Sequence, residues 1–564
     1  MKTDSQRQAF SDVSPATDTQ GQLGHPKNIE HSQRLRRQLY QVTENVWTLV
    51  GNGLSNQTFV LAPEGLICID TGECNEEMAS ALAEVRQFTQ APVAAVIYTH
   101  FHYVNGTRAI LEDNHLPDFP VYGHEDIARN LARYGGEVGP RISRGMVYQF
   151  AISMPDDGPD GRINVGLGNF FRNQDHAPFT AGHMPVTDSF KTQASLNIAG
   201  LQVEVSHAPS DSDDSVTLWF PELSVCVNNL VWPALFNVFA IRGEEYRDPR
   251  GLLTGLEHML SLKANHLLCT HGPPLSGADE IENVIVDYRD SIQLLWDQTV
   301  RAANKGLAID ELADFIHLPE RFDRSYFTQQ YYGVIEHHVK QIYTGLFGWF
   351  DESAEKLFPL PPTERATRLI AGFGGAEKVR DQISLAMESG DLRWALEMAG
   401  WLVRTSKDVD DRCRLAEVLK HIGQRTTSSN IRNWCLTRAL QLEGTINLDR
   451  FYGHRFRVPE ILAQPLERSV STLRVLLVPE KCEQLDAELL IRTTEGEQTG
   501  LRIRRGIAFR SAGDAAAATV TLPKTMWAQL LGRKLTVEQL LADAQVTVDG
   551  DSSVVSAMLN SFDW

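Results

Sequence analysis

Two histidines separated by one residue, His100 and His102, are the side chains in this sequence best suited to bind a metal ion. They follow the apolar run 93–98, which has the β-branched composition of a buried strand. Alternate residues of an extended chain point to the same side, so both imidazoles can face one ion. Neutral imidazole is a natural ligand of zinc and similar ions. An H-x-H pair alone is more often two half-buried histidines, so further ligands decide between the two interpretations.

Further candidate ligands lie in two later segments. The acidic segment 204–215 offers carboxylates at Asp211, Asp213 and Asp214. Three acids in four residues can equally form a solvated loop. A late histidine, His271, follows a short apolar run and precedes a glycine. Together these residues predict a metal site built from segments that lie far apart in the sequence.

The composition limits the classes of function. At 564 residues the chain is too long for one ordinary hydrophobic core, so several domains are expected. A formal net charge of −19 argues against nucleic acid as a partner, because nucleic-acid-binding domains carry a basic surface. No signal peptide and no membrane-spanning apolar run is visible, and the seven cysteines are scattered without C-x-x-C spacing. We therefore expect a cytoplasmic protein with reduced thiols.

The pattern of apolar residues divides the chain into parts. Residues 1–39 are rich in Ser, Gln, Asp and Thr near their start and predict a flexible tail. From about residue 40 to 283 short β-branched runs alternate with helical patterns, which is typical of an α/β layered fold. The clearest of these are the runs 46–50, 58–61, 93–98 and 201–205 and the helix 76–88.

The remainder changes character twice. From about 284 to 443 the apolar spacing becomes helical, and the segments 385–399 and 411–423 predict helical hairpins. From about 466 strands return, followed by two helices, and predict a small α+β domain. The expected strands are 473–478, 487–492 and 517–522, and the expected helices are 524–531 and 536–542.

The order of these parts resembles the alkyl sulfatase branch of the metallo-β-lactamase superfamily. Short segments similar to that family occur at 54–59, 239–243, 331–333, 348–351, 360–362, 390–395 and 548–551. The resemblance implies a metallo-β-lactamase αββα sandwich over 40–290, an all-α helical dimerisation domain over 291–445 and a sterol-carrier-like α+β domain over 446–564. It also implies a homodimer.

The resemblance also implies an assignment of the metal ligands. It places the first metal site on His100, His102 and Asp211, with Asp213 and Asp214 as rivals for the carboxylate, and the last ligand on His271. The family motif H-x-H-x-D-H ends here in Val104 and Asn105, and its bridging acid aligns with Asn229. Valine cannot bind a metal, and a neutral amide is a poor bridge between two cations. We therefore predict a depleted second site and one divalent metal, zinc in the first place and iron as the alternative.

Two arginines, Arg242 and Arg247, match positions where the family binds sulfate, and guanidinium groups suit tetrahedral oxyanions. The alternative is that both form ion pairs with the adjacent acids Glu244, Glu245 and Asp248. Further substrate contacts are expected from Asn56, Thr58 and Tyr148.

The resemblance implies hydrolysis of an alkyl sulfate, a small molecule with an aliphatic chain and an anionic head, to sulfate and an alcohol. His271 and Asp211 are the expected catalytic residues, and His271 would act as general acid or base or as a fourth ligand. Two other functions stay open: a mononuclear iron or zinc enzyme of another reaction class, and a non-catalytic dimeric binding protein.

Overall fold

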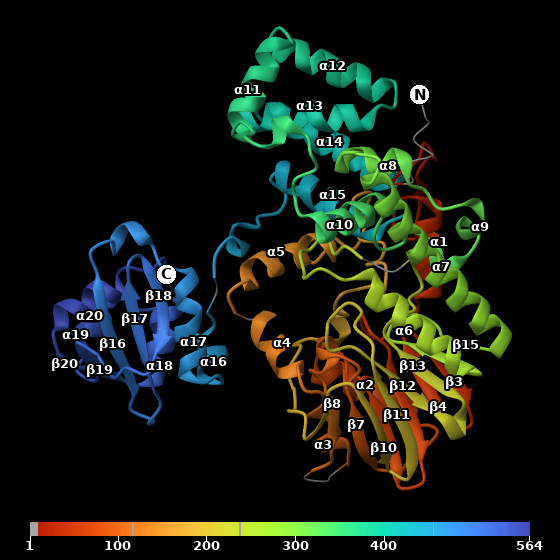
Figure 1. The fold of residues 1–564 in the computed structure, drawn as a ribbon, viewed down its shortest axis with the longest axis horizontal. Coiled ribbons are helices and arrows are strands. Elements are labelled where there is room, and N and C mark those ends of the chain that lie inside the picture. The colour runs from red at the N-terminus through yellow and green to blue at the C-terminus, as the bar shows by residue number, and fades with distance from the viewer. Residues whose placement is uncertain (1–8, 115–117, 135, 236–237, 455) are drawn as a thin grey trace. The chain divides into compact units, whose positions relative to one another are not determined.

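The computed structural model describes residues 9–114, 118–134, 136–235, 238–454 and 456–564 (Figure 1). The chain divides into two compact units. The first contains the residues up to Leu131 together with Gly145–Asn447, and the second contains Ala132–Arg144 and Leu448–Trp564.

Two β-sheets face each other in the first unit. The seven-stranded sheet runs in the order β3 (Gln38–Thr43), β4 (Val46–Val50), β5 (Gln57–Ala62), β6 (Gly65–Ile69), β7 (Val93–Ile97), β8 (Val121–His124) and β9 (Asp188–Phe190). The six-stranded sheet runs in the order β10 (Gln193–Ile198), β11 (Leu201–His207), β12 (Val216–Phe220), β13 (Val225–Asn228), β14 (His266–Cys269) and β15 (Leu275–Ser276). Strands β6 to β9 pair in parallel, so their carboxyl ends meet at one edge.

Helices cover the outer faces of both sheets. The inner faces share one hydrophobic core, to which Ile67 and Ile97 contribute from the first sheet and Val203 and Leu268 from the second. Helix α2 (Asn75–Val85) packs on β5 and on α3 (Ala109–Asn114), while α6 (Pro249–Leu262) and α7 (Ala278–Ala303) pack on β12 and β14. Strands β4 and β6 are therefore buried along their whole length, as covered sheets require. This is the expected αββα sandwich.

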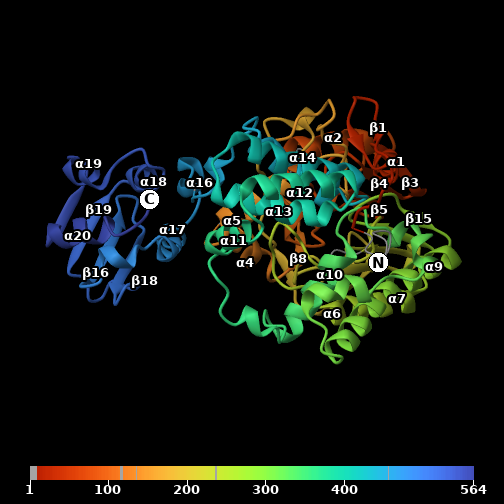
Figure 2. The same ribbon diagram turned by 90° about the horizontal axis from the view of Figure 1, so that it is seen from above.

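The helical part of this unit is continuous with the sandwich. Helix α7 runs through the expected boundary at residue 290, and its side chains share a core with α6, α8 (Leu312–Phe315) and α10 (Ile335–Phe347). A separate core forms among α11 (Pro362–Gly372), α12 (Ala376–Glu388), α13 (Leu392–Thr405), α14 (Val409–Arg425) and α15 (Ser429–Leu442), which pack on one another in succession (Figure 1; α11 to α14 also in Figure 2). The expected boundary at 290 and 291 thus lies within helix α7, and both parts belong to one compact unit.

The segment expected to be a flexible tail is instead folded from residue 9 onward. It contains the hairpin β1 (Ala16–Thr17) and β2 (Leu23–Gly24) and the helix α1 (Pro26–Arg34). Asn28 donates a hydrogen bond to Ser429 at 2.9 Å, and Arg432 donates to the Leu23 carbonyl at 2.8 Å. The partners of this segment in these two hydrogen bonds lie about 400 residues away in the sequence. The composition of the segment alone therefore could not predict that it is folded.

His31 of α1 is one of these buried anchors, with 1% of its surface exposed. Its Nε2 lies 2.7 Å from the Gly166 carbonyl oxygen, and its Nδ1 lies 3.0 Å from the Tyr326 hydroxyl. A carbonyl oxygen only accepts, so Nε2 carries the proton and Nδ1 accepts from Tyr326. Burial lowers the pKa of this imidazole to about 4, so it is neutral in the folded chain near pH 7.

Acid should therefore destabilise the fold through His31. The unfolded chain binds a proton there below about pH 6.5 and the folded chain only near pH 4, so stability is lost as pH falls through that window. In His31→Gln, the loss of unfolding free energy between about pH 7.5 and about pH 5 should be smaller by ~2 kcal/mol. Urea denaturation at the two pH values measures it. Equal losses in the variant and the native chain would contradict the assignment.

The second unit is a small α+β domain. Its sheet runs in the order β18 (Ile507–Ser511), β17 (Gln498–Arg504), β16 (Asp486–Thr493), β19 (Ala518–Leu522) and β20 (Thr547–Gly550). Its helices are α16 (Val458–Leu462), α17 (Leu466–Thr472), α18 (Lys524–Leu531), α19 (Val537–Ala542) and α20 (Ser552–Leu559), and α4 (Ile127–Tyr134) and α5 (Gly139–Gln149) contribute to both units. The prediction of a strand at 473–478 is wrong. Leu473–Val475 forms a 3-10 turn, and the side chain of Leu473 enters the core.

Among the helices that the structure describes, none is at once long enough and apolar enough to cross a membrane.

Candidate metal centre

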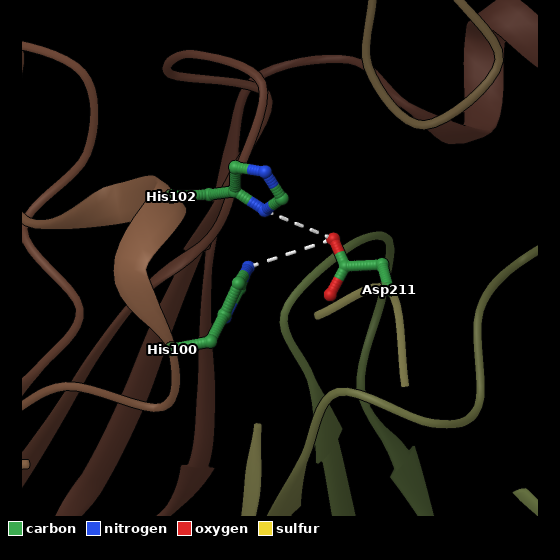
Figure 3. A group of neighbouring side chains, drawn as sticks. All are labelled: His100, His102 and Asp211. Atoms are coloured by element: carbon green, nitrogen blue, oxygen red, sulfur yellow. Dashed lines mark ion pairs between the residues drawn. The ribbon is translucent and has the colours of Figure 1, made fainter. Parts of the chain in front are cut away.

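Three side chains that can bind a metal ion meet where β7 and β11 end (Figure 3). The Nδ1 atom of His102 lies 3.1 Å from Oδ2 of Asp211, and Nε2 of His100 lies 3.7 Å from the same oxygen. The potential ligand atoms of the three residues all lie within 4.8 Å of one another. His100 has extended backbone and His102 lies in the 3-10 turn Phe101–Tyr103, so a turn, and not a continued strand, aims both imidazoles at one point.

A chain of hydrogen bonds fixes the tautomer of His100. Thr99 donates its backbone N–H and its hydroxyl to Asp70, at the end of β6, at 2.8 and 2.7 Å. With its proton used there, the Thr99 oxygen accepts from Nδ1 of His100, 2.8 Å away. Nε2 of His100 is then unprotonated and has no hydrogen-bond partner among the described residues. Burial lowers the pKa of His100 to about 3, which keeps the ring neutral.

Asp211 is the acid of its loop that faces the histidines. Burial alone would raise its pKa, but the neighbouring His100 and His102 hold it well below the ordinary range. Of its rivals, Asp213 pairs with Arg129 on the surface, and Asp214 accepts a hydrogen bond from Ser212. Neither of these carboxylates joins the cluster of potential ligands.

Asn229, which follows β13, holds Asp211 in place. Its amide nitrogen donates to Oδ1 of Asp211 at 2.6 Å, and its oxygen accepts from the indole N–H of Trp232 at 3.2 Å. Only Oδ2 of the carboxylate is therefore directed at the two histidines. Asn229 takes the place of a bridging acid in sequence but acts as a hydrogen-bond donor to the remaining ligand.

His271 lies outside the three-residue cluster. Its Nδ1 is 3.0 Å from the Leu54 carbonyl oxygen, so this nitrogen carries the proton. Its Nε2 is 3.4 Å from the Tyr103 hydroxyl, and its ring packs edge-on against Trp232. Burial lowers the pKa of His271 to about 4, so it is a neutral proton acceptor near pH 7. The ring of Tyr103 packs edge-on against both His271 and His100, so His271 shares this neighbour with the cluster.

The positions of the missing second-site ligands are used for packing. Val104 is fully buried and forms a β-bridge with Gly72, and the backbone N–H of Asn105 donates to the Gly72 carbonyl. These contacts tie the histidine turn to the end of β6. Neither Val104 nor Asn105 has an ionisable side chain, so neither position supplies a charged ligand.

The arginine pair forms the second part of the site. Arg242 and Arg247 both donate to the carboxylate of Glu244, one to each oxygen. All three side chains are buried, with 9%, 4% and 4% of their surfaces exposed for Arg242, Arg247 and Glu244. The carboxylate of Glu244 lies 3.9 Å from Nε2 of His102, which joins the two parts of the site. The sequence analysis gave ion pairing with an adjacent acid as the alternative role of these arginines. Such pairing does occur, with Glu244, and the paired side chains are buried.

The α5 end supports Arg242. The Arg242 N–H donates to Gln149, whose amide donates in turn to the Tyr332 hydroxyl at 2.8 Å. The Arg242 guanidinium lies 5.4 Å from the ring centre of Phe150, within the range of a cation–π contact. Gly145 lets α5 approach, because a Cβ there would stand 1.9 Å from the Arg242 carbonyl oxygen.

The three other expected substrate contacts have structural partners. Asn56 donates to the carbonyls of Cys269 and Gly272, and so clamps the turn that carries His271. The hydroxyl of Thr58 pairs with that of Thr48 across β4 and β5 at 2.9 Å. Tyr148 donates to Gln441 of α15 and stacks on Trp434.

Two acids near the site were not singled out as functional from the sequence. Glu73 is partly buried, and burial raises its pKa while Arg172, His102 and Arg242 lower it. Glu244 appeared only as a possible surface partner of the arginines. Its position between two matched arginines, Arg242 and Arg247, was the one signal that could have pointed to it.

The αββα sandwich with an H-x-H turn and a carboxylate at the strand ends defines a member of the metallo-β-lactamase superfamily. A linear primary-alkylsulfatase of Pseudomonas sp. (strain ATCC 19151) is 33% identical over 89% of this chain and 98% of its own length. The chain therefore belongs to the alkylsulfatase family.

Other comparisons agree with this placement. Residues 308–445 match the family model described as alkyl sulfatase dimerisation. An alkyl/aryl-sulfatase of Saccharomyces cerevisiae is 25% identical over 93% of this chain and 82% of its own. The structure of the stereoselective inverting sec-alkylsulfatase Pisa1 from Pseudomonas sp. superposes with a TM-score of 0.82 at 22% identity, covering 100% of this chain and 93% of that chain. This last likeness establishes the fold.

Proposed function

We propose that this chain hydrolyses the sulfate ester of an alcohol with an aliphatic chain, releasing sulfate and the alcohol. The observation that carries the proposal is the pair of buried arginines, Arg242 and Arg247, that lies beside the His100, His102 and Asp211 cluster. Two guanidinium groups suit a sulfate headgroup. The alkylsulfatase relatives, which match over nearly the whole chain, support the same reaction.

We infer that the cluster holds one divalent metal ion, with zinc as the first candidate and iron as the second. Two neutral imidazoles and one carboxylate are the donor set of mononuclear hydrolytic zinc sites and equally of two-histidine, one-carboxylate iron sites. The unprotonated Nε2 of His100, without a hydrogen-bond partner among the described residues, supports this fit. When bound, such an ion lowers the pKa of a coordinated water and so makes a nucleophile available near neutral pH.

The side chains then take distinct roles. Arg242 and Arg247 hold and neutralise the sulfate group. His271, neutral and protonated on Nδ1, accepts a proton at Nε2 from the attacking water. Asp211 is fixed by Asn229 and aligns its free oxygen with the two histidines. The scattered cysteines, all free, fit a reducing compartment, and we propose a cytoplasmic location.

Sulfate release from octyl and dodecyl sulfate tests the proposal. The full-length chain, supplied with zinc or with ferrous iron, should release sulfate equally in air and under anaerobic conditions, and a chelator should abolish the release. Activity that requires both oxygen and iron would assign the chain to another reaction class. No sulfate under any condition would favour a non-catalytic binding protein.

We also predict a homodimer through the part that matches the dimerisation family. Within it, Trp349 and Phe358 expose 66% and 92% of their surfaces, which is unusual for large apolar side chains. Replacing both, as Trp349→Ser with Phe358→Glu, should weaken dimerisation by about a hundredfold or more, because buried aromatic anchors dominate interfaces. Sedimentation measures the shift, with Phe88→Glu as a matched control outside this part. A native chain that is monomeric at micromolar concentration would contradict the prediction.

A further inference from the structure

The carboxylate of Glu244 occupies the space between the two arginines. Each of its oxygens accepts from one guanidinium group, from Arg242 and from Arg247. The ion triplet is buried, and one carboxylate oxygen also lies 3.9 Å from His102. Glu244 is therefore bound in the manner expected of an anionic ligand at this position.

A carboxylate and a sulfate group compete for the same donors. Guanidinium groups bind either anion through charged, paired hydrogen bonds. Two buried cations without a counter-ion are costly, so a tethered carboxylate stabilises the pair when no ligand is present. An incoming anion then binds only by displacing Glu244, and its apparent affinity falls by the cost of that displacement.

We propose that Glu244 fills the anion subsite as an internal competitor and must leave it before a sulfate group binds. The proposal rests on the assignment of Arg242 and Arg247 to the sulfate group. The competitor lowers the affinity for every anion alike. An ester with an aliphatic chain has further binding energy from that chain, whereas free sulfate has none. Glu244 therefore weakens the binding of free sulfate, which has no chain contacts to offset the cost of displacing it.

The test is the binding of inorganic sulfate to the metal-replete, full-length chain by calorimetry. Glu244→Gln should bind sulfate ~10-fold or more tightly than the native chain, because a charge-assisted pair of hydrogen bonds no longer has to be broken. Glu245→Gln, which removes the same charge from the exposed neighbour, should bind like the native chain. The gain should disappear when Arg247→Gln is added to Glu244→Gln.

Thermal unfolding gives a second readout. Sulfate should raise the unfolding temperature of Glu244→Gln much more than that of the native chain, with sodium chloride at equal ionic strength as the control. Should Glu244→Gln fail to fold, Glu244→Asp keeps the charge but shortens the reach, and it should show a smaller gain of the same sign. Equal sulfate affinity in the native chain and these variants would overturn the proposal. Neither readout uses turnover, so a failure of the proposed sulfatase activity would be seen separately.

Discussion

Replacement of His271 with alanine should lower turnover of an alkyl sulfate by about a hundredfold or more while the metal content stays near that of the native chain. The imidazole is neutral, carries its proton on the side of Leu54 and holds its unprotonated Nε2 3.4 Å from the hydroxyl of Tyr103, which follows His102 in the chain. Proton transfer by a positioned side chain contributes about 10² to 10⁴ in rate. Because His271 lies outside the cluster of three ligands, its loss should affect chemistry and spare metal retention.

The two quantities are measured on the same preparation, by initial rates of sulfate release and by elemental analysis. His266→Ala, at the start of the strand that leads to His271, provides the matched control and should retain both activity and metal. If metal content fell in parallel with activity in His271→Ala, His271 would be a fourth ligand and its role as a proton acceptor would be wrong.

Replacement of His100 with alanine should remove the metal itself. The native chain should retain one equivalent after dialysis, because the described residues gather one set of two imidazoles and one carboxylate. Loss of an outer-shell partner typically weakens metal binding by about 10- to 100-fold, so loss of a direct ligand should weaken it by about a hundredfold or more. Sulfatase activity should be lost together with the metal.

His124→Ala is the matched control for this change. His124 is also a buried histidine at the end of a parallel strand, β8, next to the strand that leads to His100. Its Nε2 forms a hydrogen bond with the Lys191 carbonyl oxygen. The His124→Ala substitution should therefore leave the metal content unchanged. Two retained equivalents in the native chain, or full retention in His100→Ala, would show that the ligand set is wrong.

The sandwich could be predicted because its signals are local. Strands β4, β5, β7 and β11 coincide closely with runs of β-branched residues, and helix α18 matches its expected bounds. The segment 473–478 has a similar apolar run, yet no strand forms there, because Leu473 packs into the core from a 3-10 turn and five other strands complete the sheet. Tertiary packing overrode local propensity in that segment.

The metal ligands also differ in how far the sequence alone could predict them. His100 and His102 are two residues apart and were recognisable from spacing. The choice among Asp211, Asp213 and Asp214 depends on how one loop folds, and no spacing rule distinguishes carboxylates this close together. The buried setting of Arg242, the partner of Glu244, depends on α5 and Phe150, which approach it from about a hundred residues earlier in the chain. Such contacts have no signature in the sequence around the arginines.

Asn229 also limits which ions the cluster can accept. By engaging Oδ1 of Asp211, it leaves the carboxylate one oxygen to offer. Calcium takes about six to eight oxygen ligands and often a bidentate carboxylate, whereas zinc is satisfied by four ligands that include nitrogen. The amide of Asn229 therefore favours ions that need few ligands, such as zinc, and disfavours large hard cations, such as calcium, even where these are abundant.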